Sequence, residues 1–494
     1  MLRTLSLIAL VLYFAVLLFA VSREKKNTSI VDYFFAGQQL PFWALSLTFI
    51  ASWWGAGSAL STADLAFEDG ISAFWYYGVP VLIATFLMIL MARHIRKVDF
   101  LTQGRMMKIR YSPFCAKLLA LMVLLFMTFS AASQMVGIGQ FFGTYLGLNY
   151  EFAVLFGTVI VLIYSMFGGF RGVVLTDIIQ FVLLTIATVS VFIVALVSCG
   201  GWGAIHAAAV AAKKPSYFHF WSEGPKYLMY VITFGCSWMI QANVWQRITA
   251  ARNTTDARKM TIMSFFAYIP LYLIAVLTGM AGFALYKTLP EGGIVTAIVI
   301  DHTPPILGAM IFIGISAAIM STMDSLINTG AMTLVMDLFP QRKEDSQKQL
   351  RQSQIATLII TLVALLISLR IRSILIICQI ASDIITTGIF IPLCAAFFWR
   401  RGTNSGAVAS ILCGAVYSIY NFCIYLGAPF PAYWKPQSAA QIIIGVCLSA
   451  VLFVSVSLCT PPEYDKADKF LNQNKKQTKK RLHIATYEVF QNLK

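Results

Sequence analysis

The sequence predicts an all-α integral membrane protein with about thirteen transmembrane helices. Of its 494 residues, 59% are hydrophobic and only 12% are charged, whereas an average soluble domain carries about 25% charged residues. Apolar stretches of roughly 20 residues, the length that spans a bilayer, recur along the whole chain. These observations exclude a soluble enzyme, a secreted disulfide-rich scaffold and a disordered chain.

The apolar stretches predict one membrane domain, residues 1–459, followed by a basic cytoplasmic tail, residues 460–494. The predicted helices lie near residues 3–22, 41–66, 71–92, 114–145, 150–168, 173–198, 226–245, 260–286, 304–337, 352–369, 373–398, 405–426 and 437–458.

Two of the predicted helices are interrupted by small and polar residues. The second contains SWWGAGS from Ser52 to Ser58, and the seventh contains GCSW from Gly235 to Trp238, followed by Gln241 and Asn243. Broken helices at matching places in two halves of a chain are a pointer to a binding site at the membrane midplane. Glycine in a membrane helix also serves close packing, so both interpretations stay open.

The basic residues indicate which side of the membrane each loop faces. Most of the 37 lysines and arginines fall in loops on one side of the predicted helices. Because cytoplasmic loops are enriched in these residues, we expect the N-terminus outside and the C-terminus inside the cell membrane. The net charge of +16 is therefore a topology signal rather than a nucleic-acid-binding surface. The tail is expected to be solvated or to lie against anionic lipid through Lys475, Lys476, Lys479, Lys480 and Arg481.

Four acidic residues fall within the predicted helices: Asp64, Asp177, Asp324 and Asp383. No lysine or arginine is expected deep in any span. Ionisable residues inside a membrane are costly and mark ion or proton pathways by default. The acids therefore predict a cationic partner, either a metal ion or a proton. The alternative is that each acid is protonated or hydrogen-bonded for structural reasons.

The ninth predicted helix carries the densest polar stripe. Ser321, Asp324, Ser325 and Asn328 follow the i, i+3, i+4, i+7 spacing of one helix face. Ala318 lies one turn before Ser321. A hard cation such as Na⁺ prefers several oxygen ligands, and a carbonyl freed by local unwinding together with two hydroxyls would supply them. Serine and threonine also bond harmlessly to their own helix carbonyls.

The sixth predicted helix holds Asp177 and Gln180 as i, i+3 neighbours. Asp177 lies about 9 Å beyond Arg171 along the helix, since each residue advances about 1.5 Å. This position is submerged but close to the inner side, which suits an ion exit station.

Four segments, in this order along the chain, resemble the sodium:solute symporter family, which includes sodium–proline, sodium–glucose, sodium–sialate and high-affinity choline transporters. DYFFAGQQLP, from Asp32 to Pro41, is similar to the family's DYFLAGR-type segment, with Gln38 where arginine is usual. The other three are Phe167 to Gln180, similar to GGxxGVVxTDxIQ; Trp245 to Arg252, similar to xQRxxAA; and Ala317 to Asn328, similar to AAxMSTxDSxLN.

The resemblance implies a LeuT-like core of two inverted five-helix repeats, here about residues 41–198 and 226–398, that works by alternating access. It implies a sodium site at Ala51, Trp54, Ala318, Ser321 and Thr322. It further implies a second cation or proton site at Asp177, Ser321, Asp324 and Ser325. Two acids close together either raise the affinity for a cation or share a proton, so Na⁺ and H⁺ both remain open there.

The substrate is expected beside the broken helices, at Trp53, Ser58, Trp238 and Gln241, with Trp75, Tyr76 and Tyr77 closing the pocket from outside. The segment from Ala51 to Gly57, together with Ser382-Asp383 and residues 402–408, is most similar to the choline branch. Tryptophan suits a quaternary ammonium through cation–π attraction. Proline or another small zwitterion is the other lead, and simple aromatic packing is the alternative to both.

These features together predict a sodium-coupled secondary active symporter that imports a small organic solute. No enzymatic chemistry and no cofactor beyond the coupling ion Na⁺ are expected; the partners are the solute, Na⁺ and the lipid bilayer. Two alternatives remain: a proton-coupled transporter of the same fold, and a membrane-embedded solute sensor. The solute, the ion stoichiometry and the oligomeric state stay open.

Overall fold

The computed structural model describes residues 1–22, 30–98, 100–339, 346–431 and 438–471. Within these ranges the chain is helical, and its extended backbone pairs only in an isolated bridge between Leu40 and Ala251. The predicted all-α fold class is confirmed.

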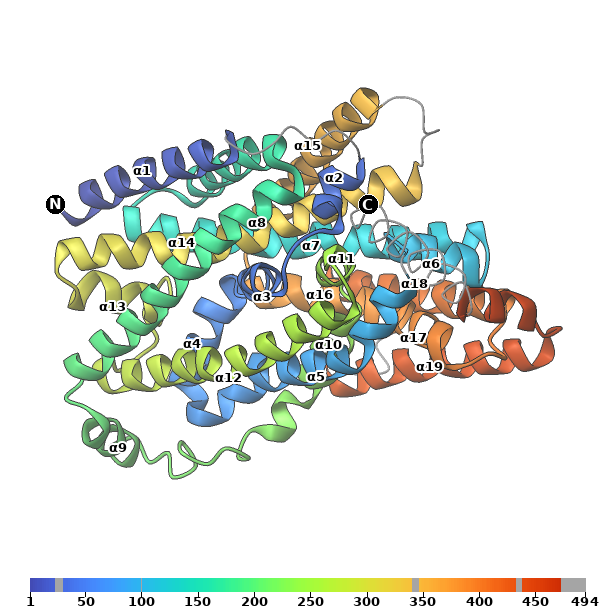
Figure 1. Ribbon diagram of the computed structural model, residues 1–494. Coiled ribbons are helices and arrows are strands. Elements are labelled where there is room, and N and C mark those ends of the chain that lie inside the picture. The colour runs from blue at the N-terminus through green and yellow to red at the C-terminus, as the bar shows by residue number, and fades with distance from the viewer. Residues whose placement is uncertain (23–29, 99, 340–345, 432–437, 472–494) are drawn as a thin grey trace.

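The long helices run side by side (Figure 1). They are α1 (Leu2–Ser22), α5 (Phe74–Val98), α7 (Pro113–Leu146), α8 (Tyr150–Ser198), α12 (Thr254–Leu285), α14 (Pro305–Thr333), α15 (Ser346–Arg370), α18 (Asn404–Tyr425) and α19 (Ala439–Cys459). Shorter helices join or interrupt them: α2 (Ile30–Phe35), α3 (Phe42–Ala51), α4 (Thr62–Asp69), α6 (Gln103–Arg110), α9 (Trp202–Ala211), α10 (Gly224–Met239), α11 (Ala242–Ala250), α13 (Ile294–His302), α16 (Ile374–Gly388) and α17 (Phe390–Phe398).

The part of the chain that the structure describes has nine helices long and apolar enough to cross a bilayer. The count becomes ten if α16 and α17, which meet at a bend of 44°, form one span. The predicted thirteen includes segments that are short or broken, among them α3, α10 and residues 150–166 of α8. The exact number of spans therefore stays a prediction.

Both predicted broken helices are present, but the second breaks later than the GCSW segment, which is continuous helix within α10. The first break lies between the end of α3 at Ala51 and a π-helical turn, Gly57–Ser61, that leads into α4. The second break separates α10, which ends at Met239, from α11, which begins at Ala242. The two spans predicted on either side of residue 169 also form one kinked helix, α8, in which Gly169 adopts a φ of 53° that favours glycine.

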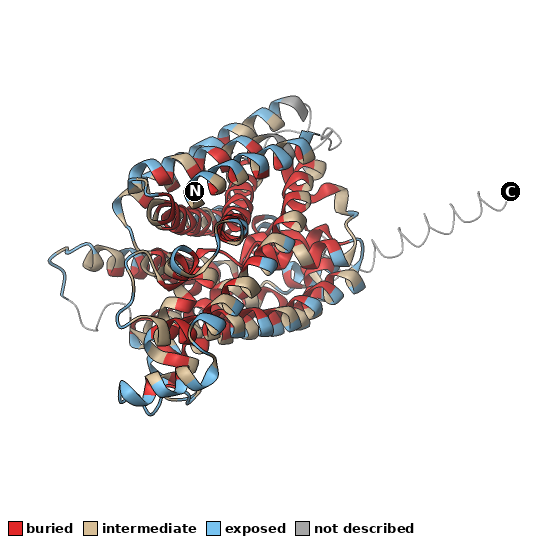
Figure 2. Cartoon of the chain, turned by 90° about the vertical axis from the view of Figure 1, so that its left-hand side faces the viewer, coloured by how far each residue is buried: buried red, intermediate tan, exposed pale blue. Residues whose placement is uncertain are grey.

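Helix α14 is the central element of the bundle. It packs against α1, α7, α8 and α15, and its side chains are buried from Ile311 to Thr333. Peripheral helices such as α1 and α18 instead carry exposed apolar side chains, including Val11 and Val416. Figure 2 shows buried residues gathered inside the bundle and exposed ones on its outer faces. An apolar exterior around a polar-lined interior is expected of helices that face lipid.

The beginning of the tail differs from its prediction. Ala467 and Phe470 are buried, and the Phe470 ring packs against Phe397 with a centroid separation of 5.4 Å. Arg400, after the end of α17, also pairs with Asp468 at 2.6 Å. Up to residue 471 the tail therefore has one apolar side docked on the protein, because Ala467 and Phe470 are covered there, while residues such as Asp465 remain exposed. The predicted lipid-facing residues Lys475, Lys476, Lys479, Lys480 and Arg481 lie outside the described residues.

Candidate ion and solute site

The first interruption presents a backbone carbonyl to α14. Helix α3 ends at Ala51, so the Ala51 carbonyl has no continuing turn of α-helix to bond with. The hydroxyl of Ser321 donates to this oxygen at 2.8 Å, and the hydroxyl of Thr322 donates to it at 3.2 Å. The same two hydroxyls lie 3.2 and 3.3 Å from the Ala318 carbonyl. We name these four residues the oxygen cluster.

Four of the five residues predicted for the sodium site thus meet in space. The fifth, Trp54, is fully buried with its ring 4.8 Å from that of Tyr272. Among the contacts of the described residues, none brings the Trp54 carbonyl to the oxygen cluster. Helix α14 also runs unbroken through Ala318, so the carbonyl freed by unwinding is that of Ala51.

The oxygen cluster suits a hard cation. It offers two carbonyl and two hydroxyl oxygens and neither nitrogen nor sulfur, which is the donor set that Na⁺ accepts. Ser321 and the two alanines are almost completely buried, and Thr322 is 6% exposed. A cation there would replace hydroxyl-to-carbonyl hydrogen bonds by direct contacts with the same oxygens.

A second cluster forms around a buried arginine. The Arg247 guanidinium, on α11, lies 3.0 Å from the Asp177 carboxylate of α8, and both side chains are fully buried. The same guanidinium donates to the hydroxyls of Ser325 at 2.8 Å and Thr48 at 3.1 Å. Thr48 in turn donates to Asp177. We name Thr48, Asp177, Arg247 and Ser325 the arginine cluster.

The arginine cluster corrects the expectation that no basic residue lies deep in the protein. Arg247 follows the predicted helix 226–245, because the apolar residues end near Trp245. The chain instead resumes as α11 after the break at Ile240, and this second half of the helix places Arg247 among α3, α8 and α14. Asp177 therefore has a protein cation as its partner, in addition to any ion.

Asp324 adds a second carboxyl group beside the arginine cluster, and no second basic side chain among the described contacts balances it. Its Oδ1 receives a long hydrogen bond from Ser325, at 3.4 Å, and the uncharged Tyr164 hydroxyl is a further neighbour of the carboxylate. The Oδ1 of Asp177 has no hydrogen-bond partner. With both acids ionised, two carboxylates face one guanidinium. Because an unbalanced buried charge is costly, the region can take up one further cation or proton.

The central cavity lies beside the first interruption and has a volume of about 50 Å³. All four residues predicted to contact solute, Trp53, Ser58, Trp238 and Gln241, line it. Thr322 of the oxygen cluster lines it too. Of the three aromatic residues predicted to close the pocket, Tyr77 is in the wall, 4.9 Å from the Trp238 ring. Trp75 instead donates to the Phe220 carbonyl, and Tyr76 packs on Tyr230.

Sequence reasoning missed the wall supplied by α7 and α16. Ser130, Ser133 and Gln134 line the central cavity from α7, and Cys378 and Ser382 line it from α16. The α7 residues follow i, i+3, i+4 spacing in an otherwise apolar helix, which was the available signal. Gln134 also accepts a hydrogen bond of 2.8 Å from the Ala56 amide in the break.

The remaining two acids lie elsewhere. Asp64 accepts a hydrogen bond of 2.7 Å from the Ile294 amide at the start of α13, so it caps that helix. Asp383 lines a different cavity. The four predicted intramembrane acids therefore do not form one pathway.

The sequence matches the sodium:solute symporter family over residues 33–414, so the chain belongs to this family. Its members are secondary transporters and not enzymes, and the coupling ion is Na⁺. The protein is accordingly a multi-pass, Na⁺-coupled membrane symporter.

Several curated proteins are similar over most of the chain. The osmoregulated proline transporter OpuE of Bacillus subtilis is 25% identical over 478 residues, covering 92% of this chain and 94% of that protein. A sodium/proline symporter of Staphylococcus aureus is 27% identical over 436 residues, covering 83% and 84%. A sodium/glucose cotransporter of Vibrio parahaemolyticus is 23% identical over 455 residues, covering 83% of each.

Solved structures share the fold. A Na⁺-coupled sialic acid symporter in a substrate-bound outward-open state has a TM-score of 0.75 at 17% identity, covering 93% of this chain and 98% of that one. A nucleobase-cation-symport-1 family transporter has a TM-score of 0.59 at 12% identity, covering 90% and 99%. The predicted LeuT-like fold is confirmed.

The arginine cluster predicts that removing Arg247 lowers the stability of the protein strongly, and that a second substitution at Asp177 restores part of it. Removing one partner of a buried ion pair costs about 3–5 kcal/mol, because the other charge is left without compensation. We expect Arg247→Met to lower the midpoint of thermal unfolding strongly in purified protein. Adding Asp177→Asn should recover part of the loss.

The matched control is Arg252→Gln, since Arg252 is exposed and bonds only to the Gln39 carbonyl among its described contacts. An Arg247→Met variant as stable as this control would show that the buried pair contributes little.

Proposed function

We propose that the oxygen cluster binds the Na⁺ that drives transport and that the central cavity binds the co-transported solute. The observation that carries this proposal is the position of Thr322, whose hydroxyl belongs to the oxygen cluster while the residue also lines the cavity wall. An ion at this hydroxyl would therefore be adjacent to bound solute. Each Na⁺ that enters down about 100 mV supplies about 2.3 kcal/mol, to which its concentration gradient adds.

For the solute we propose a small zwitterion with an ammonium group, proline first. The described wall of the central cavity has no charged side chain, but it combines aromatic rings with hydroxyl and amide groups. Trp53 and Trp238 lie 5.8 Å apart and can face a cation through cation–π attraction. The Gln241 Oε1 has no hydrogen-bond partner and can accept one from an ammonium. Two of the similar proteins are named as proline transporters.

Choline is the second candidate, favoured by the same tryptophan pair. A quaternary ammonium has no N–H group, so choline could satisfy Gln241 only through its hydroxyl, whereas the proline ammonium can donate to it directly. At about 50 Å³ the cavity holds only a few water molecules. Helices must therefore move apart to admit either solute, in keeping with alternating access between the broken helices.

We expect proline to bind the purified protein in Na⁺ and far more weakly when K⁺ replaces Na⁺. The double variant Ser321→Ala, Thr322→Ala should weaken the apparent Na⁺ affinity at least tenfold, because two of the four oxygens are lost. Isothermal titration of proline, choline, betaine and glucose at several Na⁺ concentrations measures both quantities.

Ser316→Ala is the matched control, since Ser316 is a buried α14 serine that bonds only to the Phe312 carbonyl of its own helix among the described residues. Proline binding that is indifferent to Na⁺ would contradict the proposal and favour proton coupling.

We propose in addition that Asp177, Asp324 and Ser325 form a second cation or proton site. If it binds Na⁺, Asp177→Asn should reduce the number of Na⁺ ions moved per solute by one in proteoliposomes, measured by paired isotope fluxes. Asp64→Asn, which alters the cap of α13, is the control. An unchanged ratio in Asp177→Asn would exclude a second Na⁺ at this site; a lost dependence on the pH gradient would assign it to a proton.

The proposed topology places the N-terminus outside and the inner end of the bundle, including residues 460–471, in the cytoplasm. In a cysteine-free background, an impermeant thiol reagent should label Ala212→Cys, in an exposed segment after α9, on intact cells. Asp465→Cys should react only after the cells are opened. The reverse pattern would invert the topology.

A further inference from the structure

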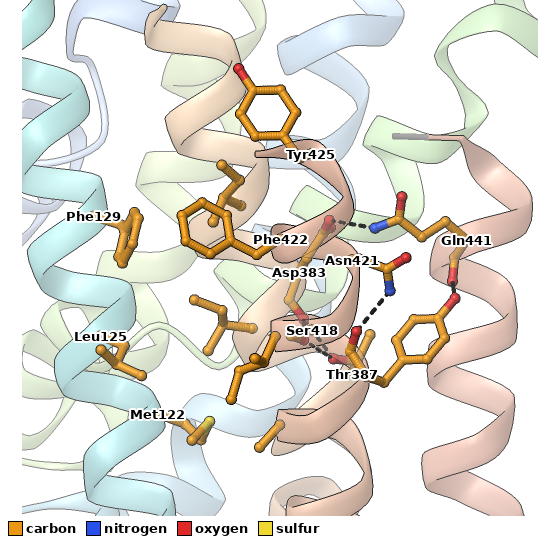
Figure 3. Close-up of a pocket in the computed structure, with 15 residues that line it drawn as sticks. Met122, Leu125, Phe129, Asp383, Thr387, Ser418, Asn421, Phe422, Tyr425 and Gln441 are labelled. Atoms are coloured by element: carbon orange, nitrogen blue, oxygen red, sulfur yellow. Dashed lines mark hydrogen bonds between the residues drawn. The ribbon is translucent and has the colours of Figure 1, made fainter. Parts of the chain in front are cut away.

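A larger cavity, of about 230 Å³, lies between α7, α16, α18 and α19. We name it the lateral cavity. Figure 3 shows the apolar side chains of Met122, Leu125 and Phe129 on its α7 side. Ile419 of α18 lines the cavity and is 61% exposed on the apolar face of that helix, so the cavity reaches the surface that faces lipid. An apolar cavity of about 150 Å³ already holds an aromatic ring.

The opposite side of the lateral cavity is polar and is built around Asp383. This side chain is 8% exposed. Its Oδ2 accepts a hydrogen bond of 3.3 Å from the amide of Gln441, whereas its Oδ1 has no hydrogen-bond partner (Figure 3). Thr387 and Ser418 use their hydroxyls on each other and on the Asp383 carbonyl. The carboxylate oxygen is therefore the unused polar atom at this position.

No basic side chain balances Asp383 within the described part of the chain. The residues that line the lateral cavity there include no lysine, arginine or histidine. The groups that interact with the Asp383 carboxyl from neighbouring helices are Thr233 and Tyr230 of α10, Tyr417 of α18 and Gln441 of α19, all uncharged. A buried carboxylate beside an apolar wall suits a ligand that carries a positive charge and hydrogen-bond donors at one end and hydrocarbon at the other.

We propose that the lateral cavity binds a primary ammonium group carried on an apolar body, with the ammonium at Asp383 and the apolar body against α7. Such a ligand comes either from the bilayer, as an aminolipid, or from a free amphipathic amine that partitions into it. The site is separate from the central cavity and does not rest on the proposed solute.

Helix α16 supplies part of the wall of both the lateral and the central cavity. Ser382 and Cys378 line the central cavity, while Asp383 and Ile380 line the lateral one. Neighbouring residues of a helix project about 100° apart, so one helix can present walls to both. The helix also packs against α18, where a side chain on Gly414 would meet the Thr387 carbonyl at 2.3 Å. A ligand in the lateral cavity would therefore hold α16 in this position.

The test uses the full chain in phosphatidylglycerol nanodiscs, with hexylamine and 1-hexanol as probes that differ in the ammonium group. Isothermal titration should show saturable binding of hexylamine and at least tenfold weaker binding of hexanol. Asp383→Asn should weaken hexylamine binding at least tenfold, whereas the exposed-site control Asp465→Asn should not. Ala415→Phe keeps the carboxylate and fills the cavity, and should abolish binding as well.

Equal binding of hexylamine and hexanol, or hexylamine binding that survives both Asp383→Asn and Ala415→Phe, would overturn the proposal, as would no saturable binding. If Asp383→Asn does not fold, Ala415→Phe still decides the outcome. Repeating the titration in nanodiscs with phosphatidylethanolamine separates the two sources. Weaker hexylamine binding there supports a lipid amine as the occupant, and unchanged binding supports a free amine.

Discussion

One buried guanidinium joins four of the helices that surround the proposed ion site. Arg247 reaches α3 through Thr48, α8 through Asp177 and α14 through Ser325, while its own helix is the second half of a broken span. A charge at this depth persists only while its partners stay in place, because water is not available to substitute for them. The four elements therefore either move as one body or admit water when they separate.

The same requirement for partners applies to the backbone of the broken helices. Inside a membrane, a freed amide or carbonyl must find a partner within the protein. In the first break the Ala51 carbonyl is met by Ser321, and the Ala56 amide is met by Gln134. In the second, Gln103 donates to the Ile240 carbonyl at 2.7 Å, and the Trp245 ring donates to the Met239 carbonyl at 2.8 Å. Each interruption thus comes with polar residues from distant helices.

The sequence was most informative where a pattern is local. The apolar stretches, the break after Ala51 and the polar face of α14 follow from the local pattern, and the family resemblance added the pairing of Ala51 with Ser321 and Thr322. The second break was expected a few residues too early, at Gly235 to Trp238, because the glycine there is tolerated inside α10. The sequence was least informative where the pattern depends on contacts across the fold. Arg247 lies beyond the end of an apolar stretch and so resembled a loop residue. The spacing of Ser130, Ser133 and Gln134 marks a polar face on α7, but nothing local shows that this face meets the first break. The start of the tail resembled a solvated segment because Phe470 follows a run of charged residues.

One residue shared between two sites has a thermodynamic consequence. Thr322 belongs to the oxygen cluster and to the wall of the central cavity, so if these are the ion and solute sites, occupancy of one would alter the free energy of filling the other. Linkage makes that effect reciprocal: whatever factor a bound ion adds to solute affinity, bound solute adds to ion affinity. The solute concentration outside the cell would then set how tightly the ion is held. At low ion concentration, abundant solute would recruit its own driving ion.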